Sequence, residues 1–326
     1  MWNQLKKLLS AIGPFVGLIV VYAVFFFWAP ESFHSLYNTK TILTQTVIYG
    51  IAAMGMTVII ISGGIDLSVG SLVALGTVVT AKILEPQMGE QVGIWLPILA
   101  LLSGILVCSF CGFITGSIVA SLGIVPFIVT LGMMQVARGA AKGVAEQTTV
   151  NAPQTWLNQL MLVEPTPGAW YSVAPGVWIM LVLAVTMYVV LKYTVFGRRV
   201  FAIGSNEDTA RLCGIRVRLN KLFIYVVGGT FAGIASVMQF SNLTLGDPTA
   251  AVGMELTVIA AVVIGGGSLS GGEGSVIGSL VGALIMAVLR NGCNLVGIPN
   301  YVQNIVIGTI IITAVGVDRL RHARQS

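Results

Sequence analysis

The residue types that most often carry out catalysis or bind metals are scarce in this sequence. The two histidines, His34 and His322, both fall outside the apolar stretches. The H-E-x-x-H pattern of zinc proteases and the G-x-S-x-G pattern of serine hydrolases do not occur in the sequence. We therefore expect no histidine-based catalysis, no metal site and no cofactor.

Two of the four cysteines, Cys108 and Cys111, form a C-x-x-C pattern. This spacing can serve redox or metal chemistry. Here both cysteines lie on one face of a long apolar run with no histidine nearby, so we interpret them as small residues that pack within a helix. Cys213 and Cys293 lie far from this pair, and the four together do not form a disulfide framework.

A glycine-rich stretch at 265–274, GGGSLSGGEG, could be mistaken for a nucleotide site. It lacks the Gly-Lys-Ser/Thr ending that places a lysine on a phosphate. Its Leu-Ser-Gly-Gly at 269–272 matches the signature of ABC ATPase domains, but the chain has no Walker A motif for it to work beside. We interpret the stretch as a membrane-associated turn.

The stretch SGGIDLSVGS at 62–71 is a better candidate for function. Gly63 and Gly64 break the preceding helix, and Asp66 is a lone acid between two apolar runs. Ionisable groups at such positions are expensive and often functional. Alternatively, Asp66 or Ser68 caps the next helix by accepting from its free N–H groups. Both interpretations stay open.

The composition identifies the solvent in which these residues work. Hydrophobic residues make up 56% of the 326, and charged residues only 9%, whereas an ordinary soluble domain carries about 25% charged residues. We therefore predict an all-α, polytopic membrane helix bundle that forms a single domain over 1–326, with the lipid bilayer as its surroundings. The net charge is +5, but no run of Lys and Arg is long enough to predict a nucleic-acid partner.

Charge-free windows of about 20 residues mark the expected membrane spans. Three of these segments, 67–84, 252–267 and 274–290, are short or rich in glycine, and each either spans fully or is re-entrant. The run after Lys6 and Lys7 is longer than a usual signal peptide, so we expect it to be a retained first span. About ten transmembrane helices are predicted, at 13–29, 42–61, 67–84, 94–118, 122–138, 176–196, 222–240, 252–267, 274–290 and 300–317.

The distribution of positive charge predicts the orientation of the chain. An even number of spans places both ends on one side. With the N- and C-termini in the cytoplasm, twelve of the 17 Lys and Arg lie inside, seven of them in the segment 192–221. This arrangement satisfies the positive-inside rule, and the inverted one violates it.

Small residues recur at four-residue spacing in three of the expected spans, which allows helix backbones to approach closely. We interpret these stripes as packing within one bundle, and a contact between subunits is the alternative. The stripes are Gly112 and Gly116, then Gly229 and Gly233, and then Gly274, Gly278 and Gly282.

Two of these stretches resemble known segments of one family. SGGIDLSVGS at 62–71 and AIGSNEDTARLCGI at 202–215 are similar to the hallmark and the coupling segment of the ribose-type sugar permeases of bacterial ABC importers. The stretches 265–278 and 298–303 are also similar, so the resemblance covers nearly the whole chain. Cys213 departs from it mildly, because a small residue such as serine is common at this position.

The resemblance implies a transporter subunit and not an enzyme. The chain would be the membrane permease of an ATP-driven importer for a simple sugar, a ribose-like pentose or a hexose. It would reside in the bacterial inner membrane, usually as two copies in a homo- or heterodimer. Its partners would be a cytoplasmic ABC ATPase, in which ATP is hydrolysed, and an extracytoplasmic sugar-binding protein.

The resemblance also implies that the cytoplasmic segment at about 197–221 couples the permease to the ATPase, with 204–215 as a short helix. Local sequence agrees, because Asn206 can cap such a helix and Gly214 can end it. The alternative is a solvated helix without a partner. The expected coupling residues are Gly204, Asn206, Glu207, Ala210, Arg211 and Gly214, and the possible functional turn is Gly63, Gly64, Asp66 and Ser68.

An ion-gradient-driven secondary transporter of a small polar solute is the alternative function. Such proteins tend to place ionisable residues within spans, whereas the acids here, such as Asp66 and Glu273, fall near span ends. Neutral amides beside the apolar runs suit a hydroxyl-rich neutral solute, although amides also hold helices together. They are Gln45, Gln135, Gln239, Asn242, Asn291, Asn294, Gln303 and Asn304.

Overall fold

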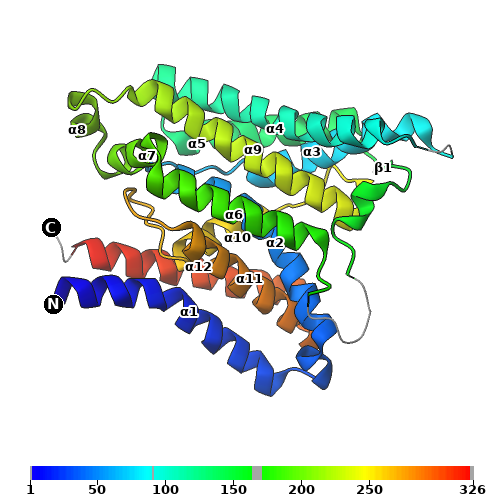
Figure 1. Ribbon diagram of the computed structural model, residues 1–326, viewed down its shortest axis with the longest axis horizontal. Helices are drawn as coiled ribbons and strands as arrows, with labels where there is room; N and C mark the ends of the chain where they lie inside the picture. The colour runs from blue at the N-terminus through cyan, green and yellow to red at the C-terminus, as the bar shows by residue number, and fades with distance from the viewer. Residues whose placement is uncertain (1, 90–91, 164–170, 324–326) are drawn as a thin grey trace.

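A computed structural model describes residues 2–89, 92–163 and 171–323, and they form an elongated bundle of α-helices (Figure 1). The helices are α1 Trp2–Trp28, α2 Leu36–Ile61, α3 Val69–Leu84, α4 Trp95–Leu122, α5 Pro126–Val144, α6 Pro175–Tyr193, α7 Val195–Ser205, α8 Glu207–Leu212, α9 Val217–Leu243, α10 Met254–Ile264, α11 Val276–Val296 and α12 Asn300–Ala323. Short 3-10 turns lie at Glu31–His34, Glu85–Gln87 and Trp156–Gln159, and the two-residue strands β1 Val150–Asn151 and β2 Leu245–Gly246 pair antiparallel.

Six helices in the described residues are long and apolar enough to cross a membrane, namely α2, α3 with the turn that follows it, α4, α6, α9 and α11. Three shorter apolar stretches lie in α1, α10 and α12. The expected all-α, multi-pass architecture is therefore correct. The count of about ten spans stays a prediction.

The segments 67–84, 252–267 and 274–290, which were expected either to span the membrane fully or to be re-entrant, form helices of different lengths. α11 has 21 residues and is long and apolar enough to cross the membrane fully. α10 has only 11 residues, a length of about 17 Å against the ~30 Å of a hydrocarbon core. α3 has 16 residues and follows the non-helical segment 62–68. The start of α3 lies against the start of α10, because a Cβ on Gly70 would overlap the carboxylate of Glu255.

The small-residue stripes pack within the bundle. On α4, Gly112 and Gly116 contact α9, and a Cβ on Gly116 would lie 2.9 Å from the carbonyl oxygen of Leu222. On α9, Gly229 packs closely against α4, because a Cβ on Gly229 would lie 2.5 Å from the carbonyl oxygen of Cys108. On α11, Gly278 and Gly282 pack in the same way on α10 and its C-cap, whereas Gly274 lies in the turn before α11 and faces the side chain of Ile61 on α2. The interpretation of bundle packing is therefore confirmed for these positions.

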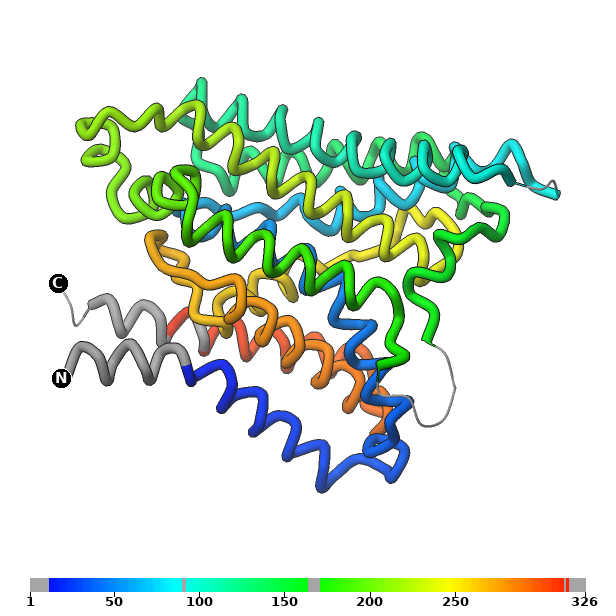
Figure 2. The backbone as a smooth tube through the Cα atoms, in the orientation of Figure 1, coloured from blue at the N-terminus to red at the C-terminus, as the bar shows by residue number. Residues whose placement is uncertain are grey.

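The polar segment 192–221 contains two helices, α7 and α8, which meet at an angle after the end of α6. Figure 2 shows them at the same end of the bundle as the turn that precedes α11. Figure 1 places the start of α1 and the end of α12 at this end as well. The bundle thus carries its principal polar element at one end only.

Candidate functional site

Three segments that are distant in the sequence meet at one point, which we call the joint. They are Ile61–Gly63 at the end of α2, Gly204–Ser205 at the end of α7, and Gly271–Gly272 in the turn before α11. The amide of Gly272 donates a hydrogen bond of 2.8 Å to the carbonyl of Ile61. Gly204 packs against both groups, so the expected coupling segment is in direct contact with the end of α2 and with the turn before α11.

Only glycine fits at several positions of the joint. A Cβ on Gly204 would overlap the Ile61 carbonyl oxygen and lie 2.6 Å from the Gly272 amide nitrogen. A Cβ on Gly271 would lie 2.7 Å from the Gly204 carbonyl oxygen. Gly271 and Gly272 also have φ angles of +85° and +77°, which favour glycine. The backbones of α2, α7 and the turn before α11 therefore touch at this point without side chains between them.

The predicted helix over 204–215 is divided in two. Gly204 and Ser205 end α7, and Asn206 has an extended backbone (φ −163°, ψ 109°) that prevents one continuous helix. The side chain of Asn206 then caps α8 by accepting a 2.8 Å hydrogen bond from the Thr209 amide. Gly214, at φ +82°, follows the end of α8. The predicted start of the helix is therefore wrong by three residues, while its cap and its end are correct.

Charged groups attach α8 to the start of α9. Glu207 accepts from Lys221 at 2.6 Å and from Arg211 at 3.2 Å. Between these residues and the stretch 119–126, which runs from the end of α4 to the first residue of α5, lies a recess of about 420 Å³. Arg218 also lines this recess. Leu212, on the other side of α8, is 89% exposed. An apolar side chain so exposed at the polar end of the bundle is available to a partner.

Ala210 lies on the inner face of α8. It is buried against Ile203 and Val217 in a small apolar cluster that is separate from the main core. Together with Asn206 and Glu207, it fixes how α8 sits on the bundle. The exposed side chains of α8, among them Asp208 and Leu212, are therefore the ones that could reach another protein.

The turn at 62–68 begins at the joint and leads to α3. Gly63 has a φ of +82°, and a Cβ on Gly64 would lie 2.6 Å from the hydroxyl oxygen of Tyr225 on α9. Asp66 is buried and accepts from the amide of Ser68 at 2.7 Å and from its hydroxyl at 2.6 Å. Burial raises the pKa of the Asp66 carboxyl, and the bonds from Ser68 lower it.

These bonds define what Asp66 does locally. Ser68 is the N-cap residue of α3, and its own side chain makes no capping bond. Asp66 therefore does not cap α3 itself. It lies two residues before the N-cap residue Ser68 and fixes the conformation of that residue. Its role in transport stays a prediction.

Sequence reasoning missed Ile61, Gly271, Gly272 and Tyr225 as members of this region. The glycine pair at 271–272 could have been identified from the sequence, since two adjacent glycines outside a helix often mark a close approach between backbones. Ile61 and Tyr225 could not, because each sits within an ordinary apolar helix. The Tyr225 hydroxyl is buried and has no hydrogen-bond partner within the described part of the chain.

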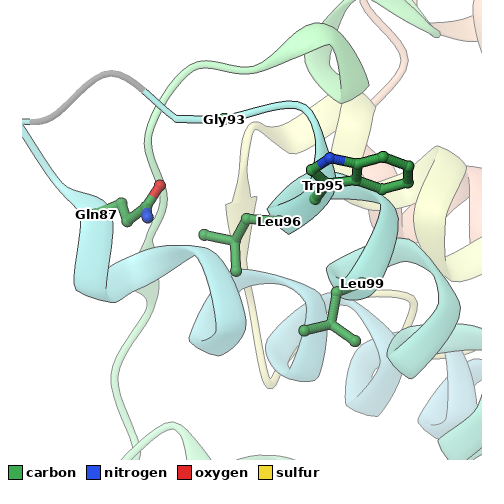
Figure 3. A pocket seen from close by; sticks show the side chains of 5 residues that line it. All are labelled: Gln87, Gly93, Trp95, Leu96 and Leu99. Atoms are coloured by element: carbon green, nitrogen blue, oxygen red, sulfur yellow. The ribbon is translucent and has the colours of Figure 1, made fainter.

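A second cavity, of about 390 Å³, lies at the opposite end of α3 and the start of α4 (Figure 3). Leu96 and Leu99 line it together with Trp95, which is 78% exposed, and Gln87. Exposed tryptophans are typical anchors at a membrane interface. The lining is apolar apart from Gln87, so it offers few groups to a polar solute.

The structure is that of a multi-pass helical membrane protein whose principal polar segment, α7 and α8, lies at one end of the bundle. A protein-family sequence model described as "Branched-chain amino acid transport system / permease component" matches residues 38–315 of the chain. The ribose import permease protein RbsC of Bacillus subtilis (strain 168) is 37% identical over 97% of this chain and 94% of its own length. RbsC of Escherichia coli (strain K12) is 38% identical over 94% and 93% of the two chains. The D-allose transport system permease protein AlsC of Escherichia coli (strain K12) is 31% identical over 94% and 91%.

The chain therefore belongs to this family of ABC importer permeases, and it is a transporter subunit of the inner membrane. The resemblance seen in the sequence is confirmed over nearly the full length. No solved structure is significantly similar to the chain.

Proposed function

We propose that this chain is the membrane subunit of an ATP-driven importer for a simple sugar, a ribose-like pentose or a hexose. The similarity to ribose and allose permeases over nearly the whole chain carries this proposal. Two copies would form the path, with both chain ends in the cytoplasm. A separate ABC ATPase would bind on the cytoplasmic side, and a sugar-binding protein would deliver the solute from outside.

The geometry of the joint supports α7 and α8 as the coupling element. α8 offers Leu212 to a partner on its outer side and is fixed to α9 through Glu207 and Lys221 on its inner side. α7 ends on Ile61 and Gly272, so movement of α8 is transmitted to α2 and to the turn before α11. Alternating access requires such a two-state link between the ATPase and the spans.

Uptake into proteoliposomes tests the proposal. The chain is reconstituted with its ATPase and binding protein, and uptake of labelled ribose and allose is measured with and without orthovanadate. ATP-dependent uptake that vanadate stops, and that persists when ion gradients are collapsed, is the expected result. Uptake that vanadate does not inhibit and that requires an ion gradient would instead show that the protein is a secondary transporter.

A further inference from the structure

The exposed face of α5 differs from the exposed faces of α4 and α6. Both of those helices are long and apolar enough to cross a membrane, although only 33% and 28% of their apolar windows are buried in the bundle. α5 has 19 residues, as many as α6, but it is not among the helices of that apolar class in the described residues. Lipid can cover α4 and α6, whereas the exposed face of α5 combines apolar side chains such as Leu131 and Val136 with the polar Gln135.

Gln135, together with Arg138 and Lys142, lowers the apolar character of α5. It is the tenth residue of the helix and its side chain is exposed, with no hydrogen bond in the described part of the structure. Gly132 and Gly139, one turn before and one turn after, face open space, since a Cβ on either would meet no atom within 4 Å. An unpaired amide facing hydrocarbon is unfavourable, so this open stretch belongs beside water or another polar group.

A charged cluster surrounds Arg138, which lies three residues after Gln135 on α5. Arg138 is half-buried, and its Nη1 donates to the carbonyls of Pro248 at 3.0 Å and Ala250 at 2.8 Å. The carboxylates of Asp247 and Glu255 act on the same guanidinium electrostatically. Charged groups at such positions in a membrane protein mark solute paths. Because the acids balance Arg138, the cluster does not select for an anion.

α5 is also connected to the joint. The Thr130 hydroxyl donates a 3.2 Å hydrogen bond to the carbonyl of Ile65, in the segment that leads from Ile61 to α3. A movement of α7 would therefore pass through Ile61 and Ile65 to α5. Thr130 lies five residues before Gln135 on the same helix.

We propose that the face of α5 around Gln135 lines the aqueous path of the solute between two copies of the chain, and that Gln135 hydrogen-bonds a neutral, hydroxyl-rich solute. An amide donates and accepts at once, as a hydroxyl does, so it matches such a solute without a charge. This inference rests on the proposed function and assigns the path within it.

Cysteine accessibility tests the proposal in a Cys213→Ser background, because the other three native cysteines are buried. Gln135→Cys is compared with Val185→Cys, the eleventh residue of α6, which is 65% exposed. Proteoliposomes that contain the ATPase and binding protein are treated with a charged, membrane-impermeant methanethiosulfonate reagent. Labelling at position 135 should be at least about ten-fold faster than at 185, since only a hydrated thiol ionises and reacts.

The solute should slow labelling of Gln135→Cys, and the attached charge should abolish most uptake. Labelling no faster than at position 185, or labelling that leaves uptake unchanged, would overturn the inference. If Gln135→Cys does not assemble, Gly132→Cys on the same face tests the same expectation. A dry contact between copies would appear as disulfide cross-linking of Gly139→Cys without reagent access, and this also contradicts the proposal.

The labelling rates separate this inference from the proposed function. Vanadate-sensitive uptake of the Cys213→Ser protein is measured first in the same vesicles. Its absence contradicts the proposed function, whatever the labelling shows. Its presence together with slow labelling at 135 contradicts the assignment of the path alone.

Discussion

The amide of Gly272 donates a 2.8 Å hydrogen bond to the carbonyl of Ile61, and Gly204 packs against both groups. The C-terminal carbonyls of a helix have no partner within the helix itself. Here the turn before α11 satisfies one of those of α2, at the place where α7 ends. The bond therefore ties the turn before α11 to the end of α2, and Gly204 at the end of α7 packs against the backbone of both.

Replacing Gly204 with alanine should disturb this joint. The added Cβ would overlap the Ile61 carbonyl oxygen, and overpacking of this kind costs about 1–3 kcal/mol. We expect sugar uptake to fall strongly and the thermal midpoint to drop modestly. The measurements are proteoliposome uptake and a thermal melt in detergent. Gly93→Ala is the matched control, because a Cβ there meets no atom within 4 Å, and wild-type uptake by Gly204→Ala would argue against the joint.

Replacing Asn206 with alanine should loosen α8. The cap on the Thr209 amide is lost, which costs about 1 kcal/mol in a helix of only six residues. We expect weaker association with the ATPase in a pull-down, at unchanged protein abundance. Asn206→Asp keeps an acceptor oxygen and should restore association. Equal association of both variants would mean that the cap is not needed for coupling.

The pair Asp66→Asn and Asp66→Ala separates hydrogen bonding from charge. Asparagine retains an oxygen for the two bonds from Ser68, whereas alanine leaves buried donors unpaired at about 1–3 kcal/mol. Uptake should survive in Asp66→Asn and be lost in Asp66→Ala. Loss of uptake in both variants, with intact assembly, would show instead that transport requires the carboxylate charge.

The ion pair between Glu207 and Lys221 should contribute little to stability. Its side chains are 39% and 20% exposed, and pairs of this kind contribute about 0–1 kcal/mol in water and less at high salt. A double-mutant cycle with Glu207→Gln and Lys221→Met, followed by thermal unfolding, measures the coupling energy. We expect ATPase stimulation to be more sensitive than stability to these changes. A coupling energy well above this range would mean that water has little access to the pair.

The sequence alone predicted much of the architecture. Its low content of charge required a bilayer, and the spacing of its apolar windows located the apolar helices, although both bounds were correct within three residues only for α3, α6 and α10. The capping of α8 by Asn206 was also predictable, because caps depend on neighbouring residues only. The motifs at 62–71 and 202–215 led to the correct family by resemblance.

The tertiary structure decided which residues act together. Nothing in the local pattern indicated that Gly204 would contact Ile61 and Gly272, or that Thr130 would bond to Ile65. The same holds for α10, whose 11 residues were part of a longer predicted span. Local sequence determines propensity, period and caps, whereas a contact between distant segments depends on how whole helices pack. The chain of contacts from α7 to α5 therefore exists only in the folded bundle.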